Sequence, residues 1–327
     1  MDTSHLLDPE LVAALEVLPP VQLSLEGLPA MRAEAAAQPR PELPDDVQER
    51  EVLVPRPGRE PLRLLLTRPV DLPTPAPAVL WIHGGGFVLG SADEDRVETA
   101  SYARAVGMLV VSVDYGLAPE NPHPGPVEDC FTALRWVHDN AAELGVDTAR
   151  VGVGGGSAGG GLAACLALLA RDRGGPPLAF QFLVFPMLDD RTVTTDDPNP
   201  VTGEFVWTRE ANAFGWRCLL GTAPGGPDVS PYAAAARAQD LSGLPPAFLE
   251  VGSLDLFLDE DLEYARRLVR AGVPTELHVH PGAFHGYQRA LTSTVARTSA
   301  QLGTTALRRA LQETAWQAPS GRATLTT

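Results

Sequence analysis

The chain has 327 residues, of which 25 are basic and 41 acidic, so its formal net charge is −16. Every basic residue is Arg, and the absence of Lys excludes a Walker A phosphate loop, a Schiff-base enzyme and a pyridoxal-phosphate site. The acidic balance argues against a surface for nucleic acid or anionic membrane, because phosphates would be repelled. Three cysteines, an N-terminus without a basic region and no apolar run of the ~20 residues that span a bilayer predict a soluble, cytoplasmic protein.

The first 45 residues differ from the rest of the chain. Leu6–Leu18 has the spacing of an amphipathic helix, with Asp8 at the position of an N-cap. Met31–Gln38 predicts a second short helix, and the Pro-rich stretch 39–44 ends it.

Apolar strands then alternate with helices. A hairpin is predicted at Glu51–Val54 and Leu62–Thr67. Further strands are predicted at Ala78–His83, Met108–Asp114, Arg150–Gly154, Phe180–Phe185, Ala247–Val251 and Thr275–His280. Helices are predicted at Arg96–Val106, Val127–Leu144, Ser157–Arg171, Asp259–Ala271 and Ala296–Gln312. Near-continuous apolar strands between helices are typical of a parallel sheet covered on both faces.

One long stretch, Leu188–Gly243, interrupts this alternation. It is rich in Pro, Thr and Gly and contains one predicted helix, Glu210–Leu220. A segment of that length between two strands indicates a lid or a functional loop. The polar tail Glu313–Thr327 is expected to be mobile.

The residues 155–159 match G-x-S-x-G between a predicted strand and a predicted helix. A serine on so tight a turn is held in a strained backbone conformation with its hydroxyl exposed, and its neighbours two residues away must be small. The start of the following helix adds a partial positive charge where negative charge would develop. The pattern alone also fits a Gly-rich turn without chemistry.

The same glycines offer another interpretation. Gly154, Gly156 and Gly159 spell the dinucleotide-binding fingerprint G-x-G-x-x-G. That fingerprint usually lies in the first strand-to-helix turn, whereas several strands precede this one. The acid expected about 20 residues further on is also absent, since Asp189 and Asp190 lie beyond that distance.

His83 is followed by three glycines, 84–86, directly after a predicted strand. Such a run is costly in conformational entropy and needs a reason. Two backbone N–H groups of this loop, with that of Ala158, would suit a tetrahedral oxyanion. The alternative is a flexible loop.

A base and an acid follow the last strands, where α/β folds place function. His285 comes just after the final predicted strand, and Asp255 follows the strand before it. The acids at 259–261 are rivals, but they are typical of the first turn of a helix. His278 and His280 share one face of the final strand, and either a metal pair or core and solvated positions would explain them, although no cluster completes a metal site.

Five motifs between about residues 78 and 290 carry a family resemblance. They are HGGGF (83–87), DYGLAPE (114–120), GGSAGGG (155–161), GSLDLFLDE (252–260) and HPGAFHGY (280–287). The chain resembles the hormone-sensitive-lipase-like α/β-hydrolases, bacterial esterases marked by an HGGG loop. The order Ser157, Asp255, His285 is the chain order of α/β-hydrolases.

The resemblance implies an α/β-hydrolase fold, with a mostly parallel eight-stranded sheet, helices on both faces and a helical cap. The catalytic core would comprise 46–187 and 231–315. The cap would comprise 1–45 and 188–230, and 316–327 would be a flexible tail. Dimerisation through the edge of the final strand is a further implication.

The resemblance also assigns roles. Ser157 would be the nucleophile, His285 the base and Asp255 the residue that orients it. The oxyanion N–H groups would come from Gly85, Gly86 and Ala158. The expected activity is that of a carboxylesterase that cleaves small apolar esters through an acyl-enzyme, without metal or cofactor. A receptor-like binder, a lyase or an amidase on the same fold are the alternatives.

Four aromatic residues of the cap segment are candidates for an acyl or alcohol pocket, or for packing the cap onto the core: Phe205, Trp207, Phe214 and Trp216. The chain departs from the family pattern at two positions, and both departures bear on the rigidity of the site and the efficiency of the reaction. Gly156 stands where the family usually has an acid or Thr, and Gly116 stands where DYRLAPE has Arg, a potential cationic brace.

Overall fold

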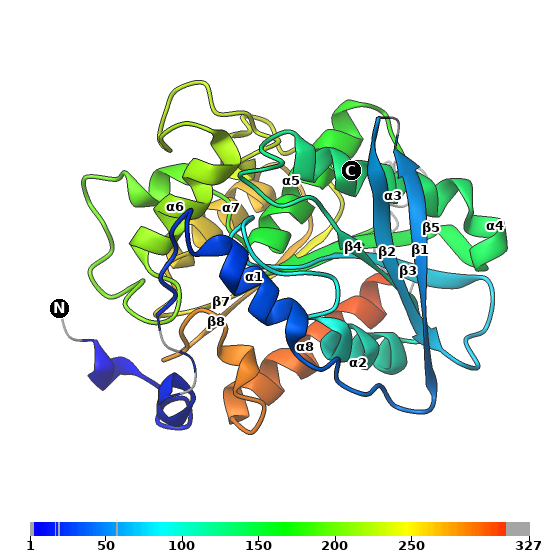
Figure 1. Cartoon of the computed structure of the whole chain (residues 1–327), viewed down its shortest axis with the longest axis horizontal. Coiled ribbons are helices and arrows are strands. Elements are labelled where there is room, and N and C mark those ends of the chain that lie inside the picture. The colour runs from blue at the N-terminus through cyan, green and yellow to red at the C-terminus, as the bar shows by residue number, and fades with distance from the viewer. Residues whose placement is uncertain (1–2, 17, 19, 57, 312–327) are drawn as a thin grey trace, which may run out of the picture.

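The computed structural model describes residues 3–16, 18, 20–56 and 58–311. Its centre is one eight-stranded sheet with the order β1-β2-β4-β3-β5-β6-β7-β8 (Figure 1). The strands are β1 Val47–Arg56, β2 Arg59–Pro69, β3 Ala76–Ile82, β4 Leu109–Asp114, β5 Val146–Gly156, β6 Gln181–Val184, β7 Ala247–Gly252 and β8 Thr275–His280. β2 pairs antiparallel with β1 and β4, and the remaining pairs are parallel. The predicted fold class is confirmed.

Helices cover both faces of the sheet. The helices are α1 Leu28–Ala37, α2 Arg96–Val106, α3 Gly125–Asp139, α4 Ala141–Leu144, α5 Ala158–Asp172, α6 Arg209–Leu220, α7 Leu258–Arg270 and α8 Thr294–Leu311. Short 3₁₀ helices are Ser4–Leu6, Val12–Glu16, Asp190–Val193, Ala235–Arg237 and Tyr287–Arg289. One buried cluster joins α3, α5 and α7 to one face, and a second joins α2 and α8 to the other.

Alternation within β3 explains why the sheet is buried on both faces. Leu80 and Ile82 belong to the cluster under α3 and α5, whereas Val79 and Trp81 belong to the cluster under α2 and α8. Successive side chains of a strand point to opposite faces, so a strand covered on both sides must be apolar throughout. The nearly continuous run of apolar residues, from which this strand was predicted, is a consequence of burial on both faces.

Two helix predictions were wrong in part. Leu6–Leu18 does not form one helix but contains two 3₁₀ turns. Here the Asp8 carboxylate accepts a bond from the Glu10 N–H, and the Asp8 N–H donates to the Gly282 carbonyl, so tertiary docking replaces helical bonds. The predicted helix 127–144 breaks at Asn140, whose side chain bonds the Trp136 carbonyl.

The two predicted cap segments meet over the loops that follow β3 and β4. Leu28 of α1 and Cys218 of α6 lie in a small buried cluster with Val88 and Ala118, so both segments pack on the loops after β3 and β4. The division into core and cap stays a prediction, and the predicted tail 316–327 lies outside the described residues.

Within the described part of the chain, no helix has the length and apolarity needed to cross a bilayer. Cytoplasmic location stays a prediction.

Candidate active site

Ser157 lies on the turn between β5 and α5. Its backbone has φ 57° and ψ −123°, a conformation that costs a non-glycine residue free energy and persists only where the surroundings hold it. The Ser157 N–H donates to the Val184 carbonyl at 2.9 Å, and its carbonyl accepts from Met187 and Gly161, each at 2.9 Å. These three bonds fix the strained turn and present the hydroxyl at the start of α5.

The glycines around Ser157 are required by close backbone packing. A Cβ on Gly155 or on Gly159 would collide with the carbonyl oxygen of Ile82 at the end of β3. The strand-to-helix turn can therefore approach the neighbouring strand only with glycine at both positions. The G-x-S-x-G pattern reflects this contact.

Ser157, His285 and Asp255 meet although they are far apart in the sequence. His285 Nε2 lies 2.9 Å from Ser157 Oγ, across 128 positions of the chain, and its Nδ1 lies 2.8 Å from Asp255 Oδ2. The Asp255 Oδ1 accepts the Phe257 N–H at 3.0 Å. Because a carboxylate only accepts, the Nδ1–H of His285 donates to it, and Nε2 is left to accept from the serine hydroxyl.

The site is enclosed by aromatic rings. Asp255 is fully buried, and Ser157 and His285 are each 7 % exposed. The rings of Phe185 and Phe257 each make a T-shaped contact with the His285 imidazole, at centroid distances of 4.8 and 5.0 Å. An apolar enclosure of this kind fixes the ring and strengthens electrostatic interactions inside it.

Carbonyls of the loop after β3 are held by hydrogen bonds within that loop. His83 Nδ1 lies 2.8 Å from the Gly84 oxygen, and the Gly85 oxygen accepts from the N–H groups of Val88 and Leu89. In a trans peptide the N–H points opposite to the preceding carbonyl, so these bonds orient the N–H groups of Gly85 and Gly86. Among the described residues, the N–H groups of Gly85, Gly86 and Ala158 have no acceptor.

Of the four aromatic pocket candidates, one lies beside His285 and three pack elsewhere. Trp207 lies 6.2 Å from the His285 ring, and its indole covers Gly86. Phe205 packs near Phe284, Phe214 joins the cluster of Leu28 and Val88, and the fully buried Trp216 lies against Phe87. Phe185, at the end of a predicted strand, and Phe257, inside the motif 252–260, were not predicted as site residues, because an apolar side chain gives no signal of chemistry.

The two departures from the family pattern have different surroundings. A Cβ on Gly156 would meet only Phe185 Cε2, at 3.6 Å, so the position beside the serine has room for a side chain. Gly116 packs on Asn121 instead. The buried Asp129 near Gly116 is bound by two arginines of the β1–β2 hairpin, Arg56 at 2.6 Å and Arg59 at 2.9 Å. The hairpin supplies a cationic brace at this loop.

His278 and His280 have separate carboxylate partners. His278 Nε2 lies 2.7 Å from Glu276 Oε1, and His280 Nε2 lies 2.9 Å from Glu250 Oε2 in the core. No group of three or more His, Cys, Asp or Glu side chains within the described ranges is placed to hold a metal ion.

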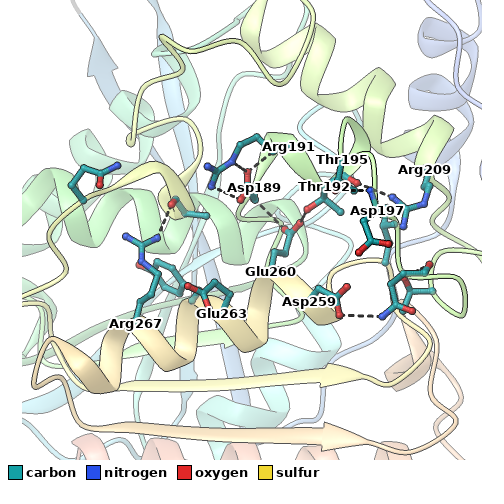
Figure 2. Close-up of a pocket in the computed structure, with 16 residues that line it drawn as sticks. Asp189, Arg191, Thr192, Thr195, Asp197, Arg209, Asp259, Glu260, Glu263 and Arg267 are labelled. Atoms are coloured by element: carbon teal, nitrogen blue, oxygen red, sulfur yellow. Dashed lines mark hydrogen bonds and ion pairs between the residues drawn. The ribbon is translucent and has the colours of Figure 1, made fainter.

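A cavity of about 570 Å³ lies beside the turn that carries Asp255, between the segment 189–209 and α7 (Figure 2). Leu256, next to Asp255, lines it, but Ser157, Asp255 and His285 do not. In its wall, Glu260 accepts the N–H groups of Leu188 and Asp189 at 2.6 and 3.2 Å. Burial raises the pKa of Glu260 well above its usual range.

Comparisons with known proteins agree with this geometry. A family profile described as the alpha/beta hydrolase fold matches residues 79–289. The carboxylesterase NlhH of Mycobacterium tuberculosis is 37% identical, over 93% of this chain and 96% of its own length. The esterase LipI of the same species is 35% identical, over 88% of this chain and 89% of its own.

Solved structures are similar over nearly the whole length. A bacterial heroin esterase superposes with a TM-score of 0.87 at 43% identity, covering 95% of this chain and 99% of that one. The esterase LipW from Mycobacterium marinum gives a TM-score of 0.80 at 35% identity, covering 94% and 97%.

Proposed function

Since this chain belongs to the α/β-hydrolase fold family and is a carboxylesterase, we propose that it cleaves small apolar carboxylic esters through an acyl-enzyme on Ser157. The resemblance to hormone-sensitive-lipase-like bacterial esterases is confirmed by its relatives. The observation that supports the proposed mechanism is the bridge made by His285, which is 2.9 Å from the Ser157 hydroxyl and 2.8 Å from the Asp255 carboxylate.

Acylation begins when Ser157 Oγ attacks the ester carbonyl carbon. His285 Nε2 takes the hydroxyl proton, and Asp255 stabilises the imidazolium that forms and keeps its Nδ1 protonated. The C–O bond to the alcohol breaks as the tetrahedral intermediate collapses, and His285 returns the proton to the leaving alcohol. Water then attacks the acyl-enzyme with the same imidazole as base, which releases the acid and restores Ser157.

The negative charge of the tetrahedral intermediate develops on the former carbonyl oxygen. In this mechanism the N–H groups of Gly85, Gly86 and Ala158 donate to that oxygen. Each such donor is typically worth about 3–4 kcal/mol of transition-state stabilisation, because it is already oriented before the reaction.

The walls of the site favour a small, apolar substrate. Phe185, Phe257 and Trp207 surround the imidazole, and little of Ser157 is exposed. Apolar walls bind acyl and alcohol groups by removing their surface from water, at about 25 cal/mol per Å². A hydrophobic enclosure with few polar groups gives no partner for a charged substrate.

A panel of p-nitrophenyl esters of increasing acyl length tests this proposal. Wild type should hydrolyse the short esters, Ser157→Ala should not, and the exposed Ser101→Ala variant should behave as wild type. Equal turnover by wild type and Ser157→Ala, or turnover by neither, would reject the proposal. Matched amides in the same panel separate esterase from amidase activity.

A further inference from the structure

We propose that Arg32 of α1 is a positioning residue for the oxyanion loop, defined here as residues 83–90. Through it, a helix of the N-terminal segment would set the orientation of the Gly85 and Gly86 N–H groups and thereby kcat. This inference rests on the proposed function and adds to it a residue outside the five motifs.

Arg32 joins two loops that flank the site. Its Nε donates to the Val88 carbonyl at 2.9 Å, and its Nη2 donates to the Ala118 carbonyl at 2.7 Å. Its Nη1 pairs with Glu120 Oε1 at 3.0 Å. The guanidinium is a rigid planar fork, so binding all three acceptors fixes the loop after β3 relative to the loop after β4.

The two residues whose carbonyls Arg32 binds also donate their own N–H groups to carbonyls of the oxyanion loop. The Val88 N–H donates to the Gly85 oxygen at 3.1 Å, and this is the carbonyl that orients the Gly86 N–H. The Ala118 N–H donates to the Phe87 oxygen at 2.9 Å. Arg32 therefore restrains two of the residues whose N–H groups bind carbonyls of the oxyanion loop.

The loop needs such support from outside because of its composition. Three successive glycines give residues 84–86 unusual conformational freedom, and Gly85 and Gly86 both have positive φ, 105° and 60°. Other carbonyls of the loop are held from within the core, for example that of His83 by the Tyr115 hydroxyl at 3.1 Å. Only a well-fixed loop presents its donors at the positions where the oxyanion forms.

The position of α1 itself depends on one face. Leu28 is its single buried residue, and it packs with Val88, Ala118 and Cys218. Arg32 follows Leu28 by four residues, about one helical turn, so both side chains lie on the same face of α1. Apolar packing places the helix on the loops, and Arg32 converts that contact into directional bonds.

The test compares Arg32→Met, which keeps the stem but removes every donor, with Arg171→Met. Arg171 is a matched control, because it donates to the carbonyls of Asp240 and Ser242, pairs with Asp172 and has the same 24% side-chain exposure as Arg32. With p-nitrophenyl acetate, Arg32→Met should lower kcat at least about 10-fold and change KM less than about twofold. Arg171→Met should lower Tm comparably but leave kcat within about twofold.

Arg32→Lys, which keeps the charge but cannot bridge both carbonyls, should show an intermediate kcat, and methylguanidine should raise the kcat of Arg32→Met but not of Arg171→Met. A kcat of Arg32→Met or Arg32→Lys equal to that of wild type, or equal kcat losses in the two Met variants, would overturn the inference. Ser157→Ala is assayed alongside. If it is inactive while Arg32→Lys equals wild type, the inference alone fails; if wild type shows no turnover that depends on Ser157, both fail.

Discussion

The Trp207 indole lies directly against Gly86 of the oxyanion loop. A Cβ built on Gly86 would overlap the far edge of the indole, including Cζ2 at 2.6 Å, and the φ of Gly86 is +60°. Glycine is therefore required at position 86 for two reasons: the positive φ of its backbone, and the indole that occupies the place of a Cβ. A residue of the segment 188–230 therefore covers the glycine loop beside Ser157, which lies on the turn between β5 and α5.

Gly86→Ala should reduce kcat about 100-fold, because the new methyl group must displace either the loop or Trp207. Displacing the loop misplaces the N–H group of residue 86, and loss of one oxyanion donor typically lowers kcat by about this factor. Adding Trp207→Ala should restore part of the loss by making room. Steady-state kinetics with p-nitrophenyl acetate measure both effects. The control is Gly58→Ala, which also has positive φ but has no atom within 4 Å of its Cβ. Equal kcat values for Gly86→Ala and Gly58→Ala would contradict this interpretation.

Trp207→Ala should shift the enzyme toward longer acyl chains. The indole is 5 % exposed and closes the space beside His285, so its removal leaves a cavity that extra methylenes can fill. We expect the kcat/KM ratio of hexanoate to acetate esters to rise about 10-fold or more, the range by which apolar pockets discriminate methylenes. Phe214→Ala, whose ring packs away from the triad with Leu28 and Val88, should leave the ratio unchanged. An unchanged ratio in Trp207→Ala would remove this tryptophan from the substrate pocket.

Asp255→Asn should lower kcat by about 10³–10⁴-fold with little change in structure. The amide oxygen can still accept the Phe257 N–H, so the NH₂ group would face His285 Nδ1. The imidazole would then carry its proton on Nε2, where it cannot accept from Ser157. The neighbouring Asp259→Asn variant is the control, and a similar loss of kcat in both would place the catalytic acid elsewhere.

Asp261 gives a prediction about stability. Its carboxyl is fully buried, and neither oxygen has a hydrogen-bond partner within the described residues. Burial, with the nearby charges of Glu260 and Asp255, raises its pKa well above the usual range. The native state therefore keeps a proton that the unfolded chain releases above pH ~4.

Each such group lowers the free energy of unfolding by about 1.4 kcal/mol per pH unit between its unfolded and folded pKa values. Asp261→Asn should thus gain stability relative to wild type as the pH rises from 5 to 8, and the gain should shrink toward pH 4. Urea unfolding at several pH values measures it, with Asp259→Asn as the exposed control. A stability difference that is independent of pH would show that Asp261 is ionised in the folded state.

Ser157, Asp255 and His285 could be selected as site candidates from the sequence because each lies in a short motif at the carboxyl end of a strand, and their roles stay predictions. The parallel sheet brings these ends to one edge, so local patterns with the correct strand order suffice. The hairpin and the helix Arg96–Val106 could also be predicted from local sequence. In both, the periodicity of apolar residues reflects which side chains the fold buries.

Contacts between distant segments could not be predicted in this way. The spacing of Phe205, Trp207, Phe214 and Trp216 does not reveal that only Trp207 lies beside His285, because that depends on Val206, which has φ 55° and is held by the Val21 N–H. The bonds of Arg32 join residues 56 and 86 positions away. The first residues have helical spacing, yet their docking against Gly282 replaces the helix.

The central claim is that Ser157 is the nucleophile and that His285 activates it. The most direct measurement is peptide mapping by mass spectrometry after treatment with a fluorophosphonate. The proposed mechanism predicts one adduct, on Ser157, in wild type, with labelling strongly slowed in His285→Ala. An adduct on another residue, or equal labelling rates in wild type and His285→Ala, would contradict it.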